Sequence, residues 1–265
     1  MVCRTPSLGI PLAVQEHRAS ATDPTPGYRR RRGDVVTLVA GLAVVAVAFL
    51  IMGRVDRVPD EERAVFHAIN DLPGWIRTPI EPLMQAGWFG SVLIAAVICL
   101  LVGSVSRHPR RGAAAAMAVG LAGTGAYLAA RLAKHLVNRG RPGNMLEEAR
   151  IRGAAASGLG FPSGHAAVST AIVLVLLPYL IWRWRWVLLA LPLIVAFARV
   201  YVGAHLPLDV VAGLGIGTVC ASLMNLAIGV PPRPALAVDV RNDAGGSLDE
   251  KPVPPPDEAP LGASR

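Results

Sequence analysis

Three short stretches of this chain combine the residue types that bind and attack a phosphate group. Each joins cations or histidines to residues that shape the backbone, at spacings of a few residues. They are Lys134-x6-Arg141-Pro142, Pro162-Ser163-Gly164-His165 and Arg199-x5-His205-x3-Asp209. The chain has only two lysines, at positions 134 and 251, and otherwise uses arginine, which sets Lys134 apart.

The third stretch carries a candidate nucleophile. His205 and Asp209 are four residues apart, so they share a face if the segment is helical, although Pro207 between them favours an irregular start. A carboxylate bonded to one imidazole nitrogen fixes the tautomer and leaves the other nitrogen free to attack. His165, from another part of the chain, can act as general acid to the leaving oxygen.

The second stretch has the features of an anion site at a helix start. Pro162 sets the backbone, and Ser163 is a favourable N-cap residue. The first turn of the helix then offers unpaired N–H groups and a positive dipole end. Gly164 would let phosphate oxygens approach the backbone closely. The non-bridging oxygens would be neutralised by three cations: Lys134, Arg141 and Arg199.

Each of these features has an ordinary structural explanation. A lone arginine such as Arg199 can snorkel to lipid headgroups, and Pro162-Ser163-Gly164 can be a simple helix start. Lone histidines near span ends are usually hydrated, and we interpret four in this way: His17, His67, His108 and His135. Histidines near Asp209 could also suggest zinc, but no three-ligand set with an acidic general base stands out. The order of the stretches, and the shared side described below, favour a phosphate site.

The composition shows what must position these residues. Of 265 residues 53% are hydrophobic and only 17% are charged, against about a quarter in soluble domains. Apolar runs of about 20 residues are long enough to cross a membrane as helices. We therefore predict an all-α polytopic membrane protein with six transmembrane helices. They lie near 35–53, 88–105, 113–133, 164–182, 186–203 and 208–229.

The rest of the chain is predicted to flank this membrane domain, residues 35–229. Residues 1–34 form a disordered basic cytoplasmic tail without a secretory signal, and residues 230–265 a second disordered cytoplasmic tail. The segment 54–87 is too charged to cross the membrane and should be an outer loop with one or two short amphipathic helices. The three cysteines indicate no metal site or disulfide framework.

Arginine sets the predicted orientation. Three arginine-bearing segments fall on one side of a six-span layout, and by the positive-inside rule that side is the cytoplasm. They are Arg29–Arg32, Arg107 to Arg111, and Arg183 with Arg185. The net charge of +8 is thus explained by topology rather than by nucleic acid, and no nucleic-acid partner is expected. The loop 134–163 lies on the outer side yet is also basic, which binding of an anion would explain. By parity, all three stretches meet on that outer face.

The three stretches resemble the signature of the type 2 phosphatidate phosphatase superfamily, in order and in internal spacing. The resemblance covers about residues 35–229. It implies a metal-independent lipid phosphatase of the cell membrane, without a cofactor, whose site faces the extracytoplasmic side. By this resemblance His205 is the nucleophile that forms a phosphohistidine, Asp209 orients it, and His165 protonates the leaving group. The phosphoryl group would be held by Lys134, Arg141, Ser163, Gly164 and Arg199. The family usually has serine where this chain has Ala198.

The implied substrates are a polyprenyl phosphate or diphosphate, phosphatidate, or phosphatidylglycerophosphate, embedded among membrane lipids. One alternative keeps the site but transfers the phosphoryl group to a sugar or lipid hydroxyl. Another is a non-catalytic lipid-phosphate binder or transporter, although binding alone needs neither the His205–Asp209 pair nor a second histidine. The sequence leaves open the headgroup, the tail, a preference for mono- or diphosphate, and the oligomeric state.

Overall fold

The structure is a computed structural model that describes residues 29–52, 57–153 and 158–231. These residues lie within one compact unit, Met1–Arg233, whereas the second unit, Pro234–Arg265, lies outside the described residues. Most of the two predicted tails also lies outside them. Described tail residues Arg29 and Val230 pair in an isolated antiparallel bridge.

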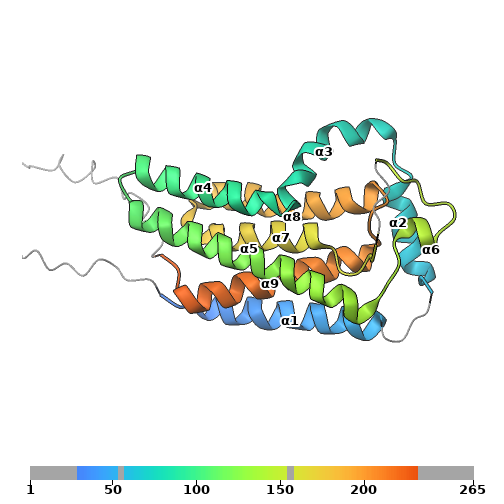
Figure 1. Cartoon of the computed structure of the whole chain (residues 1–265), viewed down its shortest axis with the longest axis horizontal. Helices are drawn as coiled ribbons and strands as arrows, with labels where there is room; N and C mark the ends of the chain where they lie inside the picture. Colours follow the sequence, from blue (N-terminus) through green and yellow to red (C-terminus); the bar gives the residue numbers. More distant parts are fainter. Residues whose placement is uncertain (1–28, 53–56, 154–157, 232–265) are drawn as a thin grey trace, which may run out of the picture. The chain divides into compact units, whose positions relative to one another are not determined.

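Helices dominate the part of the chain that the structure describes, which confirms the predicted all-α class. Six longer helices form the bundle in Figure 1: α1 (Arg32–Met52), α4 (Gly90–Val105), α5 (Pro109–Val137), α7 (Gly164–Leu176), α8 (Trp182–Tyr201) and α9 (Pro207–Ile228). Shorter helices connect them: α2 (Asp60–Asn70), η1 (Gly74–Ile76), α3 (Arg77–Met84), η2 (Gln85–Gly87), α6 (Pro142–Met145) and η3 (Leu177–Tyr179).

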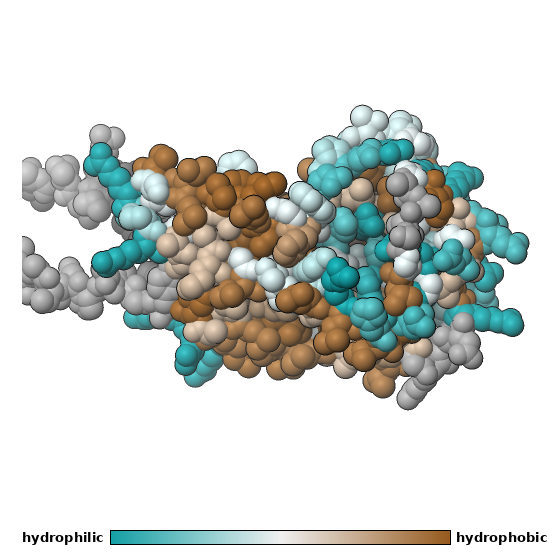
Figure 2. Space-filling view, in the orientation of Figure 1, coloured by the Kyte–Doolittle hydropathy of each residue, from teal (hydrophilic) through white to brown (hydrophobic). Residues whose placement is uncertain are grey.

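Four of the described helices are long and apolar enough to cross a membrane by themselves. They are α1, the segment Pro109–Met145 (which begins with α5), α8 and α9. A fifth candidate is α4 together with the preceding short helices, which meet it at a bend of 77°. The segment Gly164–Tyr179 is apolar but shorter. The long helices carry a largely apolar flank in Figure 2, with hydrophilic side chains gathered at the two ends of the bundle. The chain is therefore a multi-pass membrane protein with four to five clear candidate spans.

Helix α7 lies in the core of the bundle, which explains its short, apolar and small-residue sequence. Nine of its 13 residues are buried, including Val168, Ala171 and Val175. Helix α9 approaches α7 closely at two glycines. A Cβ built on Gly213 would lie 2.4 Å from the carbonyl oxygen of Ser163, and one built on Gly217 would lie 2.4 Å from that of Ala167. These two glycines let α9 hold the start of α7 beside the first turn of α9 itself.

The segment between α1 and α4 contains the predicted short helices. In Figure 1, α2 lies at the end of the bundle where α5 ends, together with α6. Helix α2 buries Phe66 and Asn70 and begins with three acidic residues, Asp60 to Glu62. The Asn70 amide donates to the carbonyl oxygens of Arg150 and Tyr201 at 3.0 and 2.9 Å, which ties α2 to the α6–α7 loop and to the end of α8.

Candidate active site

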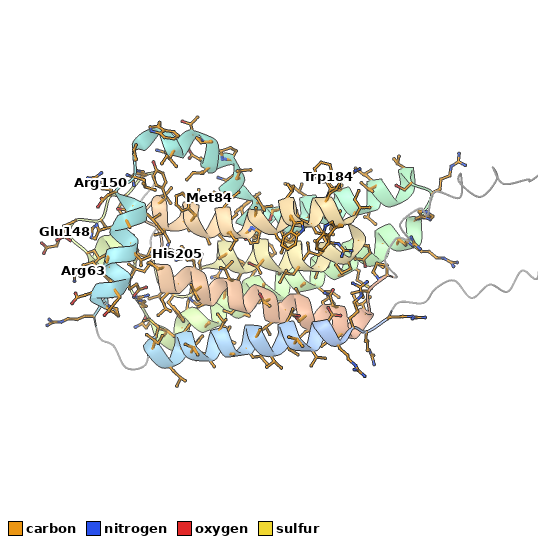
Figure 3. All side chains as sticks on the ribbon, turned by 180° about the vertical axis from the view of Figure 1, so that it is seen from behind. Arg63, Met84, Glu148, Arg150, Trp184 and His205 are labelled. Atoms are coloured by element: carbon orange, nitrogen blue, oxygen red, sulfur yellow. The ribbon has the colours of Figure 1, made fainter. Side chains whose placement is uncertain are left out.

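Six of the eight predicted site residues line one cavity of about 510 Å³. They come from four segments that are distant in sequence, and Figure 3 shows His205 at the end of the bundle that carries α2. The six are Lys134, Arg141, Gly164, His165, Arg199 and His205. The other two, Ser163 and Asp209, are fully buried behind this lining.

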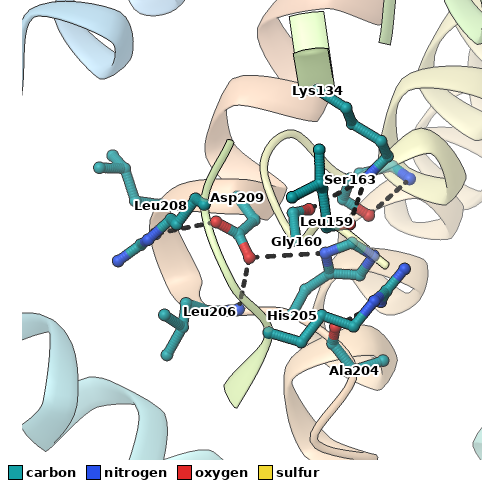
Figure 4. A network of polar contacts seen from close by, with 12 residues as sticks. Lys134, Leu159, Gly160, Ser163, Ala204, His205, Leu206, Leu208 and Asp209 are labelled. Carbon is teal, nitrogen blue, oxygen red and sulfur yellow. Dashed lines mark hydrogen bonds and ion pairs between the residues drawn. The ribbon is translucent and has the colours of Figure 1, made fainter. Parts of the chain in front are cut away.

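The three predicted cations are fixed at the cavity by backbone oxygens or by burial. The Lys134 ammonium donates to the carbonyl oxygens of Leu159 and Gly160 at 2.9 and 3.1 Å (Figure 4). Arg141 donates from Nη1 to the carbonyl oxygen of Ala204 at 2.8 Å. Arg199 contacts Met84 Sδ through Nη1 at 3.6 Å, and among the described residues its buried Nε has no hydrogen-bond partner. That donor is available to an anion.

The start of α7 is open toward the cavity. Ser163 is its N-cap, and its hydroxyl accepts from the Ala166 N–H at 3.5 Å, as the sequence predicted. Gly164 lines the cavity, and a Cβ built on it would meet nothing within 4 Å. The first turn of α7 thus borders the cavity, and its positive dipole end favours an anion there. The cap uses the Ser163 hydroxyl only as an acceptor, so its contact with phosphate through the O–H stays a prediction.

His205 and Asp209 form a buried pair at the start of α9. Nδ1 of His205 lies 3.5 Å from Oδ2 of Asp209, and the two residues are 2% and 0% exposed. The same Oδ2 accepts from the Leu206 N–H at 2.9 Å, so the carboxylate also caps α9 (Figure 4). The 3.5 Å separation is longer than an ordinary hydrogen bond, and a small movement of the imidazole would close it.

Asp209 is supported by Arg139, which is in turn paired with Glu62; neither was predicted as a site residue. Arg139 donates from Nη1 to Asp209 Oδ1 at 2.8 Å and to Glu62 Oε1 at 3.1 Å, and Nη2 makes a further contact with Glu62. Glu62 Oε1 also accepts from the Leu208 N–H at 2.8 Å. In the sequence, Arg139 is only one of several cations of the basic loop 134–163. Glu62 is 77 residues away from it, and no local pattern joins the two.

Burial and charge act together on the His205 imidazole. Its pKa lies well below the ordinary value because the ring is removed from water and because the cations Arg199, Arg141 and Lys134 lie nearby. The neutral form, which is the nucleophilic one, is therefore favoured. Burial also lowers the pKa of the Arg141 guanidinium.

The second histidine is positioned by close backbone packing. His165 lines the cavity from the first turn of α7, and a Cβ at Gly87 in η2 would fall 2.6 Å from the His165 carbonyl oxygen. Only glycine therefore lets η2 lie so close to the turn that carries this imidazole. Ala198, which stands where the family usually has serine, is fully buried and does not line the cavity.

Three further polar residues of α5 line the same cavity and were not predicted as site residues: Tyr127, Arg131 and His135. They lie on the turns of α5 that precede and follow Lys134. The sequence indicated only a hydrated interfacial histidine at position 135 and did not single out Tyr127 or Arg131. A helical wheel centred on Lys134 would have placed Tyr127 and Arg131 near its face.

Comparisons with known proteins agree with this geometry. A family model described as the PAP2 superfamily matches residues 113–230, which contain all eight predicted site residues. The chain is 30% identical over 181 residues to a decaprenylphosphoryl-5-phosphoribose phosphatase of Mycobacterium tuberculosis, covering 64% of this chain and 92% of that protein. It is 35% identical over 95 residues to an undecaprenyl-diphosphatase of Sulfolobus acidocaldarius, covering 35% of this chain and 45% of that protein.

Two solved structures share the fold. One is a transmembrane PAP2-type phosphatidylglycerolphosphate phosphatase from Bacillus subtilis, with a TM-score of 0.57 and 18% identity, which covers 72% of this chain and 94% of that one. The other is LpxE from Aquifex aeolicus, with a TM-score of 0.55 and 23% identity, which covers 64% of this chain and 98% of that one. The family match and the near-complete coverage of the mycobacterial relative show that this chain belongs to the PAP2 superfamily.

Proposed function

We propose that this chain hydrolyses phosphate monoesters or diphosphates of membrane lipids through a phosphohistidine on His205. Its enzyme class, a hydrolase of phosphate ester or diphosphate bonds, follows from its family and its named relatives. The observation that carries the mechanism is the convergence of Lys134, Arg141, Gly164, His165, Arg199 and His205 on one cavity.

The reaction has two steps with complementary roles for the histidines. The free ring nitrogen of His205 attacks phosphorus, the bond from phosphorus to the leaving oxygen breaks, and His165 supplies the proton to that oxygen. Asp209 stabilises the positive charge that develops on His205, at the 3.5 Å separation described above. Water, deprotonated by His165, then attacks the phosphohistidine and releases phosphate and neutral His205.

Charge neutralisation supplies the remaining stabilisation. A phosphoryl group in transfer carries charge on its three outer oxygens, and fixed donors aimed at those oxygens lower the barrier. Lys134, Arg141 and Arg199 and the first turn of α7 would provide such donors. Arg139 and Glu62 do not line the cavity, so we assign them the positioning of Asp209.

The proposed topology has six spans, with Gly164–Tyr179 as the short central span. An ideal helix of 16 residues is about 24 Å long, short of the roughly 30 Å hydrocarbon core. Its burial among α5, α8 and α9 supports a span that contacts protein more than lipid. Both termini would be cytoplasmic and the cavity extracytoplasmic, in the cell membrane.

The names of the relatives favour a polyprenyl-linked substrate over phosphatidate, because both curated relatives are named for polyprenyl compounds. The substrate tail would remain among the helices and lipid while the phosphate enters the cavity. The chain would need no cofactor and no metal for this chemistry.

Trapping of the covalent intermediate tests the mechanism. Purified full-length protein is mixed with 32P-labelled farnesyl diphosphate, labelled at the terminal phosphate, with and without chelator, and quenched within milliseconds. We expect acid-labile label on the wild type, none on His205→Ala, and normal labelling of the control His108→Ala, an exposed histidine that does not line the cavity.

Release of inorganic phosphate without transfer to an added lipid alcohol would distinguish hydrolysis from phosphotransfer. Unlabelled wild-type protein that binds substrate without turnover would indicate a binder. Turnover by His205→Ala at the wild-type rate would refute the nucleophile.

A further inference from the structure

Arg131 is a cation within a membrane-crossing helix that the phosphatase mechanism does not use. It lies in α5, one turn before Lys134, and lines the same cavity. No acidic side chain pairs with it among the residues that the structure describes. A charge at this depth is costly, so an unpaired one indicates a site for a partner of opposite charge.

The direction of the Arg131 side chain argues against simple snorkelling. A snorkelling arginine extends toward the nearer membrane surface, which here is the C-terminal end of α5. The guanidinium instead turns the other way, donating from Nη1 to the Tyr127 hydroxyl at 3.0 Å, with its centre 5.7 Å from the Tyr127 ring. Tyr127 is one turn deeper along α5, so the guanidinium of the exposed Arg131 extends along the cavity lining away from the nearer membrane surface.

An aromatic wall continues from Arg131 toward the apolar part of the bundle. The ring of Tyr127 packs against Phe89, just before α4, with centroids 4.4 Å apart. Phe89 is partly exposed on the flank of the bundle. From the end of α5 inward, the cavity lining thus passes from Lys134 to Arg131 and then to the ring of Tyr127, with Phe89 packed against that ring. A lipid with two adjacent phosphates has the same order of groups.

We propose that Arg131 binds the lipid-proximal phosphate of a lipid diphosphate while the terminal phosphate occupies the catalytic cations. This rests on the proposed function and assigns a diphosphate as its preferred substrate class. Residues three apart on a helix share a face and differ by about 4.5 Å along the axis. Lys134 and Arg131 can therefore contact neighbouring phosphates that share one bridging oxygen.

The reaction gives Arg131 a defined role. When His205 attacks the terminal phosphorus, the bond from that phosphorus to the bridging oxygen breaks, and the leaving group is a lipid monophosphate. Negative charge grows on the leaving phosphate, His165 protonates its oxygen, and Arg131 stabilises the remaining charge. A lipid monophosphate substrate has no group at this position, so Arg131 acts as a selectivity residue.

The ratio of kcat/KM for farnesyl diphosphate to that for farnesyl monophosphate tests the proposal. Both lipids are assayed with purified wild-type protein and with Arg131→Gln, which keeps hydrogen-bonding capacity but removes the charge. Loss of one charge-assisted contact should lower this ratio by about tenfold to a hundredfold. Arg131→Lys should retain part of it. Arg63→Gln, an exposed arginine of α2 outside the cavity, should keep the wild-type ratio.

A ratio unchanged in Arg131→Gln, with wild-type protein active on both lipids, would overturn the role of Arg131 and leave the phosphatase function standing. Wild-type protein inactive on every lipid phosphate would overturn both. Competitive inhibition offers a second measurement. Methylenediphosphonate should inhibit the wild type more strongly than inorganic phosphate does, and this difference should be lost in Arg131→Gln. The same difference in inhibition in both proteins would contradict a second phosphate subsite at Arg131.

Discussion

The proposed chemistry of the site depends on keeping the His205 imidazole neutral among cations. His205 is 2% exposed and has a pKa well below its ordinary value, first because of burial and then because of Arg199, Arg141 and Lys134. Protonated imidazole cannot attack phosphorus, so activity should persist as pH falls until the depressed pKa is reached. The cations that we propose to bind the phosphate therefore also keep the proposed nucleophile neutral.

This dependence gives a pH prediction. We expect the acid limb of kcat/KM to lie below about 6.5, the ordinary histidine pKa. Arg141→Gln removes one of the cations that lower the pKa of His205, so its acid limb should move to higher pH. Both proteins are compared on the same substrate, which cancels ionisation of the substrate phosphate. An acid limb that stays in place, or that moves to lower pH, would contradict this account.

At the residue scale, the sequence predicted the parts of the site that depend on local spacing. The motif residues were located because charged residues are rare in apolar helices, and the Ser163 cap followed from its place before α7. The support from Glu62 was missed because it depends on a contact across 77 residues, between a surface helix and a loop. Arg131 was missed because only its side-chain direction distinguishes it from a snorkelling arginine.

Helix α2 acts as a clamp on the start of α9. Through Glu62, it contacts both Arg139 in the α5–α6 loop and the Leu208 N–H in the first turn of α9. Arg139 in turn contacts Asp209, and its carbonyl oxygen accepts from the Gly160 N–H at 2.7 Å. A surface helix is thus linked to Asp209, the residue that we propose to orient the nucleophile, which would give the acidic first turn of α2 a role beyond amphipathicity.

The clamp is tested by Glu62→Gln. The neutral amide can still accept from Leu208 but pairs poorly with Arg139, so Asp209 should be held less firmly. Removing such outer support commonly lowers activity by about tenfold to a hundredfold. We expect the fall in kcat with KM nearly constant, and partial rescue by Glu62→Asp. The exposed neighbour variant Glu61→Gln serves as control for loss of charge on α2.

Thermal unfolding separates this positioning role from a general loss of structure. If kcat per folded molecule in Glu62→Gln equals that of Glu61→Gln, the clamp has no catalytic effect. The same conclusion follows if kcat falls only in proportion to the unfolded fraction.

Among the elements, the long apolar runs were predicted well and the bends were not. The helices α1, α5, α8 and α9 follow predicted spans within a few residues at most of their ends, although α5 begins four residues earlier and ends four residues later than predicted. The 77° bend before α4 was not predicted, because it depends on η2 packing against the backbone at His165. Contacts between elements, rather than apolar periodicity, set such bends.

At the scale of the whole molecule, the two ends of the bundle differ in a way that suggests orientation. The tryptophans at the start of α8 are exposed, at positions 182, 184 and 186. In Figure 3 Trp184 lies well away from His205, toward the opposite end of the bundle. Interfacial tryptophans are typical of either membrane boundary, and the arginines of the short turns are typical of the cytoplasmic one. The cationic cavity lies at the other end, where its charge is explained by anion binding.

Orientation can be measured by labelling single cysteines. The three native cysteines are replaced by serine, and one cysteine is introduced at Glu148 beside the cavity end or at Arg110 at the opposite end, both exposed. In intact cells a membrane-impermeant maleimide should label Glu148→Cys at once and Arg110→Cys only after permeabilisation. Retained phosphatase activity shows that each variant is folded. The reverse pattern would place the cavity in the cytoplasm, and the substrate would then have to come from the inner leaflet. Labelling of both positions without permeabilisation would contradict an odd number of spans between them, and with it the six-span topology.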